Sequence, residues 1–216
     1  MFEVREKLDK ATYQLKAKIN PMQLTLLDEQ IQLMLDLGFG GYLDYFSKGK
    51  KVDYKNFYKV VLSIRRATEK LWQRMSAETS TSVLGRPFKN IRSCHLLYLR
   101  SLSIFDNFYP VDKVVWAFEQ MTRDLGIADL LFKITIDDKD RPRKNPRAVC
   151  YWPKPPDEIH LVIKPIGGEQ DYEAMFHEGG HAGHMLTSEE REVFLNHEYA
   201  PMSMPWAETQ SMFLEE

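Results

Sequence analysis

Two histidines four residues apart, His177 and His181, constrain this chain more than any other feature of its sequence. Positions i and i+4 of an α-helix lie one above the other, so these two imidazoles can bind one cation if the segment is helical. Glu178 then lies beside the cation, where its carboxylate can take a proton from a water molecule that the metal activates. The pattern His177-Glu178-Gly179-Gly180-His181 therefore predicts a metal-binding helix with Glu178 as general base.

The two glycines inside this pattern break a local rule of helix formation. A glycine inside a helix costs about 1 kcal/mol relative to alanine, so Gly179 and Gly180 need a structural or functional reason. We expect that the two glycines allow a backbone or a substrate to approach the helix closely. The alternative reason is tight packing of the helix against a sheet. The pattern alone would arise by chance in on the order of one in a hundred chains of this length. A helical binding module with a chance motif is therefore a competing interpretation.

A third metal ligand is expected, because catalytic zinc usually has three protein ligands and an open position for water. His184 lies on the same helical stripe, but three histidines from one straight helix give poor tetrahedral geometry. The metzincin pattern is excluded, since it requires glycine and histidine where this chain has His184 and Thr187. The third ligand is therefore expected from a second helix.

That second helix is predicted over residues 206–215, where apolar residues follow Glu208 at helical spacing. Glu208 is the preferred third ligand and zinc (Zn2+) the expected cation, although the same ligands would accept manganese or cobalt. Glu198 and Glu215 are the rival ligands. Between the two helices there is room for a short helix over residues 189–195 and a reversal of the chain.

Hydrophobic periodicity predicts a mainly α (α+β) fold, with a small β-sheet that precedes the metal-binding helix. The predicted helices span residues 24–46, 54–75, 90–104 and the segment after Pro110, and the predicted strands span residues 132–136 and 159–163. Asp171 is expected to cap the metal-binding helix. We expect a helical lobe over residues 1–130, followed by the small sheet and the metal-binding helices over residues 131–216.

Composition argues against several classes of partner. The 29 basic and 31 acidic residues give a net charge of -2, which favours neither nucleic acid nor a membrane surface. Two cysteines cannot make a disulfide framework, so a reducing compartment is expected. No stretch approaches about 18 apolar residues, and the charged N-terminus is unlike a signal peptide. These features predict a soluble, cytoplasmic protein and indicate nothing about its oligomeric state.

Several segments resemble the thimet oligopeptidase and oligoendopeptidase F family of zinc metallopeptidases, which are gluzincins with the HExxH motif. The similar segments are residues 171–185, 207–215, 145–150 and 157–168. The first two surround the predicted metal ligands, and the other two are similar to the strand segment that precedes the motif in oligoendopeptidase-like members. The resemblance covers about residues 131–216, and the helices before it are only compatible with the family.

The resemblance implies a helical zincin-type fold around a deep cleft and a metalloendopeptidase that hydrolyses short peptides. It implies that His177, His181 and Glu208 are the zinc ligands and that Glu178 is the general base. It also implies that the substrate lies along an edge strand near residues 148–151. We therefore expect a zinc-dependent oligopeptidase-like hydrolase whose partners are short peptide substrates.

One departure from the family concerns the end of the chain. Relatives have further helices after the second-helix glutamate, with tyrosine and histidine residues that stabilise the oxyanion. Because this sequence ends at Glu216, we expect a fragment, a truncated form or a degenerate relative, with His184, His197 and Tyr199 as candidate substitute donors. The alternative function is a metal-binding or interaction domain without catalysis. A purely structural zinc site is disfavoured, since neither cysteine is near the motif.

Overall fold

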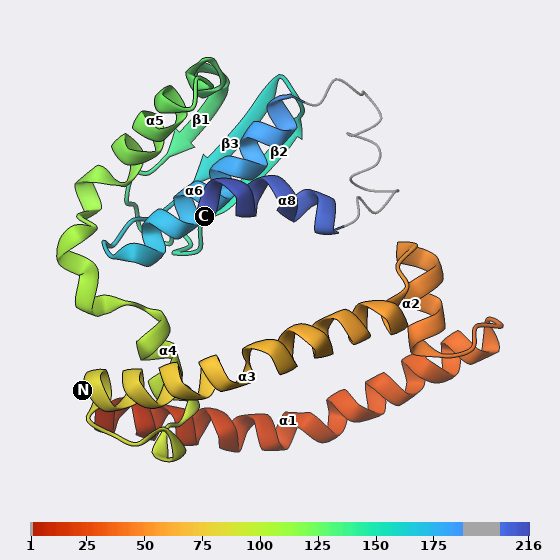
Figure 1. Cartoon of the computed structure of the whole chain (residues 1–216). Coiled ribbons are helices and arrows are strands. Elements are labelled where there is room, and N and C mark those ends of the chain that lie inside the picture. The colour runs from red at the N-terminus through yellow and green to blue at the C-terminus, as the bar shows by residue number, and fades with distance from the viewer. Residues whose placement is uncertain (1, 188–203) are drawn as a thin grey trace. The chain divides into compact units, whose positions relative to one another are not determined.

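The computed structural model describes residues 2–187 and 204–216 of the chain (Figure 1). The chain divides into two compact units, Met1–Arg100 and Ser101–Glu216. Helices make up most of both units, and the second also contains a small sheet of three strands. The predicted mainly α (α+β) class is confirmed. The division at residue 100 precedes the change in sequence pattern near residue 130, because the helix before the sheet packs in the second unit.

Four described helices form the first unit. They are α1 (Phe2–Asp36), α2 (Tyr42–Lys50), α3 (Tyr54–Leu84) and α4 (Ser93–Arg100), with the 3-10 turn η1 (Phe88–Asn90) before α4. The single helix predicted over residues 24–46 is wrong, since a turn separates α1 from α2. Gly38 and Gly41 in this turn have φ angles of 85° and 118°, which favour glycine over other residues. The helix predicted over residues 54–75 is confirmed within α3.

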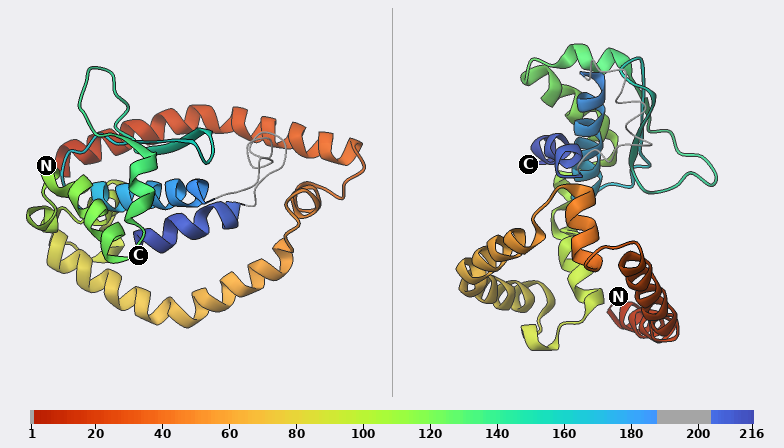
Figure 2. Two further views of the ribbon diagram at one scale, coloured as in Figure 1. Left: turned by 90° about the horizontal axis from the view of Figure 1, so that it is seen from above. Right: turned by 90° about the vertical axis from the view of Figure 1, so that its right-hand side faces the viewer.

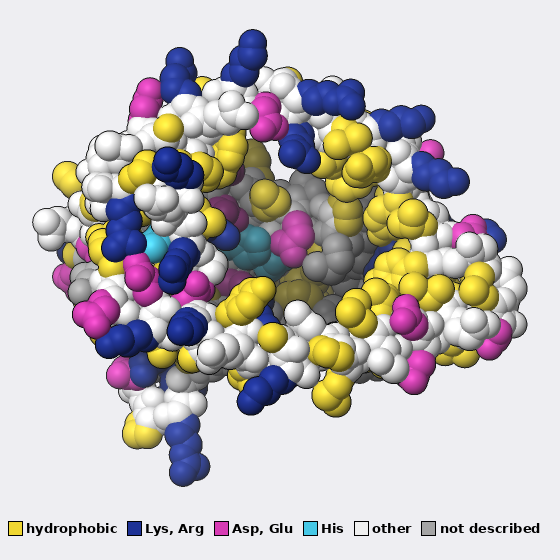
Figure 3. All heavy atoms as spheres, turned by 90° about the horizontal axis from the view of Figure 1, so that it is seen from below, with side chains coloured by type: hydrophobic (Ala, Val, Ile, Leu, Met, Phe, Trp, Pro, Cys, Tyr) yellow, Lys and Arg dark blue, Asp and Glu magenta, His cyan; other side chains and the backbone are white. Residues whose placement is uncertain are grey.

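The long helices of the first unit leave much of their apolar surface exposed. Phe57, Ile64 and Leu71 of α3 are 57%, 58% and 47% exposed, and no described residue of α1 is buried. Exposed hydrophobic side chains therefore gather on this unit (Figure 3). Helical periodicity predicts α3, but it does not reveal how little of the apolar surface of this helix the described chain covers.

The second unit is built around the sheet. Its described elements are η2 (Ser103–Phe108), η3 (Val111–Lys113), α5 (Val114–Asp124), η4 (Ala128–Lys133), β1 (Ile134–Asp137), β2 (Val149–Lys154), β3 (Glu158–Val162), α6 (Glu169–Leu186) and α8 (Met204–Glu215). The strand order is β1-β3-β2, with β1 parallel and β2 antiparallel to the central strand β3. The strand predicted over residues 159–163 is confirmed by β3. The one predicted over residues 132–136 begins two residues later, because η4 extends to Lys133.

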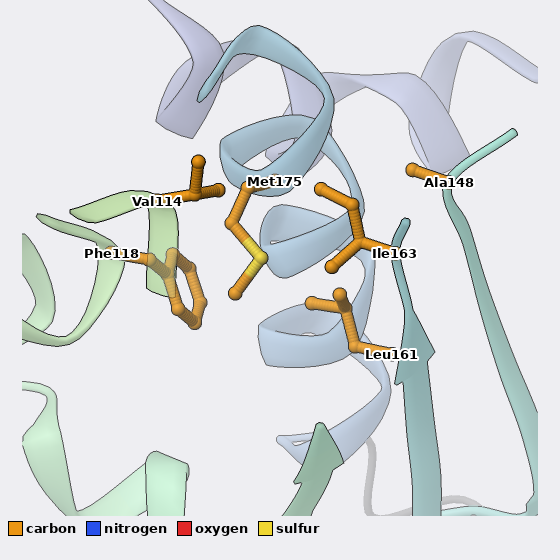
Figure 4. Packing of buried hydrophobic residues seen from close by; sticks show 6 residues of the cluster. All are labelled: Val114, Phe118, Ala148, Leu161, Ile163 and Met175. Carbon is orange, nitrogen blue, oxygen red and sulfur yellow. The ribbon is translucent and has the colours of Figure 1, made fainter. Parts of the chain in front are cut away.

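The main core of the second unit lies between α5, α6 and the sheet (Figure 4). Val114 and Phe118 project from α5, Met175 from α6, Leu161 from β3 and Ile163 from the residue after β3, all at most 2% exposed. Full burial of each such side chain stabilises the fold by roughly 1.5–3 kcal/mol relative to exposure. Since Met175 precedes the first motif histidine by two residues, this core fixes the rotation of α6 at the site.

The start of α6 differs from the prediction that Asp171 caps the helix. The N-cap is Gly168, which makes no side-chain bond, and Asp171 lies inside the first turn. Its carboxylate instead accepts hydrogen bonds of 2.6 Å from the N–H groups of Ile166 and Gly167. Asp171 therefore stabilises the turn that leads into the helix.

None of the described helices has the length and apolar character needed to cross a membrane.

Candidate metal centre

The motif segment is helical, as its sequence predicts, and it places both histidines on one side of α6. His177 and His181 lie on successive turns, with ring centroids 4.9 Å apart and ring planes nearly perpendicular at 86°. Both side chains are partly buried, with 28% and 13% of their surfaces exposed. The two imidazoles are thus close enough to share a cation and open enough to admit a further ligand.

Glu208 joins the two histidines from α8, which lies alongside α6 (Figure 2). Its Oε2 is 3.3 Å from Nε2 of His177 and 3.4 Å from Nε2 of His181. Bonds of about 2.0–2.2 Å at tetrahedral angles place two ligand atoms about 3.3–3.5 Å apart. All three ligand atoms lie within 4.8 Å of one another. These three side chains therefore fit a tetrahedral zinc ion with one position left open.

A second glutamate of α8, Glu215, fixes the orientation of His177. Its Oε2 lies 2.7 Å from Nδ1 of His177, a distance typical of a hydrogen bond to a carboxylate. Because a carboxylate only accepts, the proton of the neutral imidazole belongs on Nδ1, which leaves the lone pair of Nε2 directed at Glu208. A lone pair and a carboxylate oxygen repel each other unless a proton or a cation lies between them. Carboxylate support of this kind is usual for histidines that bind metals.

Ser211 completes the support from α8. This residue is fully buried, and its hydroxyl donates to Oε2 of Glu208 at 2.8 Å. Residues 208, 211 and 215 follow each other at offsets of three and four, so they share one face of α8. That face is turned towards the motif helix. The sequence predicts Glu208 as a ligand and Glu215 as a rival, and the structure gives Glu215 a supporting position instead.

The two motif glycines allow the neighbouring helices to approach α6. A Cβ on Gly180 would lie 2.5 Å from Cα of Ser211, so a larger residue would overlap the backbone of α8. A Cβ on Gly179 would lie 2.5 Å from Cζ of Phe118, on α5. Close backbone approach is therefore the reason for Gly180, and tight packing is the reason for Gly179. The packing partner is a helix rather than the sheet.

Glu178 faces the sheet rather than α8. Its Oε2 accepts a hydrogen bond of 2.6 Å from the main-chain N–H of Cys150, on β2. Residues 150–153 of β2 line a shallow pocket of about 270 Å³. The ring of Trp152 lies 6.3 Å from that of His181, so this pocket borders the histidine pair. Burial, with the nearby Glu178 charge, raises the pKa of the Cys150 thiol to about 12, and this thiol is therefore neither a nucleophile nor a ligand at neutral pH.

The other sequence candidates have different outcomes. His184 lies one turn beyond His181 but does not join the group of three ligand atoms, and burial lowers its pKa below the ordinary value. Glu198, His197 and Tyr199 lie outside the described residues, as does the short helix predicted over residues 189–195. The helix predicted over residues 206–215 is confirmed by α8.

Comparisons of the chain with protein-family models, with curated proteins and with solved structures find no match. The family resemblance of the segments around the two helices therefore stays a prediction.

Replacement of Glu215 tests the supporting role of this carboxylate. We expect Glu215→Ala to weaken zinc binding by about 10–100-fold, because His177 loses the acceptor that fixes its tautomer and ring orientation. The measurement is a competition titration against a chromophoric chelator. Glu216→Ala is the matched control, since it removes the adjacent, exposed carboxylate of the same chain end. Equal zinc affinity in the two variants would contradict this role.

Proposed function

We propose that this protein is a zinc-dependent metallopeptidase that hydrolyses short peptides. One observation carries the proposal: two imidazoles and a carboxylate converge at tetrahedral spacing, and Glu178, next to His177 in sequence, is hydrogen-bonded to the strand that borders the site. Two histidines and a glutamate are a ligand set of catalytic zinc, which keeps an open position for water. Closed structural zinc sites usually have four ligands and favour cysteine, which this group does not contain.

The residues of the site take separate roles in this reaction. His177, His181 and Glu208 would hold the zinc ion, with Glu215 and Ser211 fixing the orientation of two of these ligands. When bound, zinc supplies a Lewis acid that polarises the peptide carbonyl and makes water a stronger nucleophile at neutral pH. Glu178 accepts the proton of the attacking water and delivers it to the amine that leaves. The peptide bond is thus cleaved by water, without a covalent intermediate on the protein.

The substrate class is proposed from the resemblance to oligopeptidases and from the strand beside the site. β2 is an edge strand of the described sheet, and its residues 150–153 line the pocket next to His181. An extended peptide can pair with such an edge through main-chain hydrogen bonds, and pockets then select its side chains. We further propose a cytoplasmic location, which the two unpaired cysteines support.

A metal-binding domain without catalysis is the alternative function. The same ligand group supports it, since binding zinc requires only these three side chains and their supports. The two functions differ in what they require of Glu178. Only a peptidase needs a base at this position.

Replacement of Glu178 by glutamine tests the proposed function. We expect Glu178→Gln to bind about one zinc per chain, like the parent, because residue 178 is not a ligand. Peptide hydrolysis should fall by about 10²–10⁴-fold, the usual contribution of a general base. The measurements are zinc content and the turnover of a quenched fluorescent peptide. Loss of zinc in this variant would make Glu178 a ligand, and zinc-loaded parent without turnover would favour the alternative function.

A further inference from the structure

The carboxylate of Glu178 is held by the backbone of the sheet. Its Oε2 lies 2.6 Å from the main-chain nitrogen of Cys150, within the short range of hydrogen bonds to a charged acceptor. This contact joins residues 28 positions apart in the sequence. The base therefore has a fixed partner that does not belong to the group of zinc ligands.

The strand register explains why this N–H is available to Glu178. Cys150 lies opposite Leu161 in the antiparallel pair of β2 and β3. In such a pair, residues alternate between those that bond across to the partner strand and those whose N–H and C=O groups point away from it. The N–H of Cys150 points at the Glu178 carboxylate, and β2 is an edge strand of the described sheet. The Cys150 N–H is therefore directed away from β3, at the edge of the sheet, where an acceptor outside the sheet can bind it.

Packing fixes both ends of this hydrogen bond. The Cys150 side chain is buried in a cluster with Ile159, Ala182 and Met185, so β2 is pressed against α6 at this position. Ala182 and Met185 follow Glu178 on α6 at offsets of four and seven, and they share its face of the helix. The donor and the carboxylate consequently have little freedom to separate while the unit stays folded.

We propose that the main-chain N–H of Cys150 positions Glu178 as the base of the reaction and gives the two carboxylate oxygens of Glu178 different roles. Oε2 is held by the strand, and Oε1 is the oxygen that accepts and returns the proton. This inference rests on the proposed peptidase function. It goes beyond that function by assigning the orientation of the base to a main-chain group of the edge strand. The hydrogen bond is made by the main chain of residue 150, so Cys150→Ala should keep it and only removal of the N–H should abolish it.

Amide hydrogen exchange tests the contact without any requirement for activity. In the whole chain with zinc, the Cys150 amide should be protected, and Glu178→Ala should raise its exchange rate by at least about tenfold, as expected for loss of a hydrogen bond to a charged group. Glu173→Ala, an exposed glutamate of the same helix, should leave the rate unchanged. The Leu161 amide reports any general loosening of the fold. Equal rates in the two variants would overturn the proposal.

A backbone ester then tests the effect on catalysis. Replacing Cys150 by lactic acid exchanges the N–H for an ester oxygen and keeps the side chain of Cys150→Ala, the reference variant. The ester also weakens the Val149 carbonyl as an acceptor, and protection of the Leu161 amide shows whether the pairing of β2 with β3 is kept. We expect the ester to lower kcat by at least about tenfold, with KM and zinc content unchanged. An unchanged kcat would overturn the positioning role. If zinc-loaded parent and Cys150→Ala both fail to cleave peptides, the proposed function fails, and the exchange experiment alone decides whether Cys150 holds Glu178.

Discussion

Zinc binding should be lost almost completely when His181 is replaced by alanine. The candidate site offers three ligand atoms, so His181→Ala would leave only His177 and Glu208, and zinc rarely binds tightly with two protein ligands. We expect the affinity to fall by more than the roughly 10–100-fold that removal of a supporting group costs. The measurement is zinc content after dialysis, together with a chelator competition for the dissociation constant.

His184→Ala is the control for this prediction. It removes another histidine of α6, one turn further along, that does not belong to the ligand group. The control should keep about one zinc per chain. Stoichiometric zinc in His181→Ala, or equal loss in both variants, would contradict the assignment of the ligands. Because zinc binding also stabilises the folded state, the thermal midpoint should rise with added zinc in the control and not in His181→Ala.

The local parts of the site are predictable from the sequence. A helix follows from the spacing of His177 and His181, and a second helix around Glu208 follows from its apolar neighbours. The alternation over residues 159–163 likewise predicts β3 and its buried face. All of these features depend on residues close together in the chain, where periodicity carries the information.

The long-range parts are not predictable in this way. Glu215 and Glu208 are both reasonable ligands by sequence, and only the rotation of α8 against α6 distinguishes them. The bond from Cys150 to Glu178 depends on strand register, which a single sequence does not fix. Supporting groups of this kind leave no periodic signal.

The helices of the first unit also have features that the hydrophobic pattern of the sequence does not predict. The apolar stripe over residues 54–75 predicts a helix that α3 confirms, since spacing reports local structure. The same stripe does not specify what covers it, and Phe57 and Ile64 remain more than half exposed. The turn between α1 and α2 depends on Gly38 and Gly41, whose positive φ angles are absent from the hydrophobic pattern. The positions of these two glycines indicate the turn better than the hydrophobic pattern does.

Gly180→Ala should separate α8 from α6 and thereby remove a zinc ligand without touching any ligand residue. The added Cβ would lie 2.5 Å from Cα of Ser211 and 2.8 Å from the carbonyl carbon of Gln210, and backbone atoms cannot rotate away as a side chain can. Alanine gains about 1 kcal/mol in helix propensity, but overpacking costs roughly 1–3 kcal/mol. The overlap is relieved most easily by a shift of α8, which carries Glu208 away from the histidines.

Gly179→Ala is the matched control, because it adds the same methyl group one residue earlier on the same helix. Its Cβ would lie 2.5 Å from Cζ of the Phe118 ring, so the strain falls on the core beside α5 rather than on α8. We expect both variants to lose stability in denaturant titrations without zinc. Only Gly180→Ala should also lose zinc affinity, by at least about 100-fold, since a displaced Glu208 acts like a missing ligand. Equal zinc affinities in the two variants would show that the approach of α8 does not set the geometry of the site.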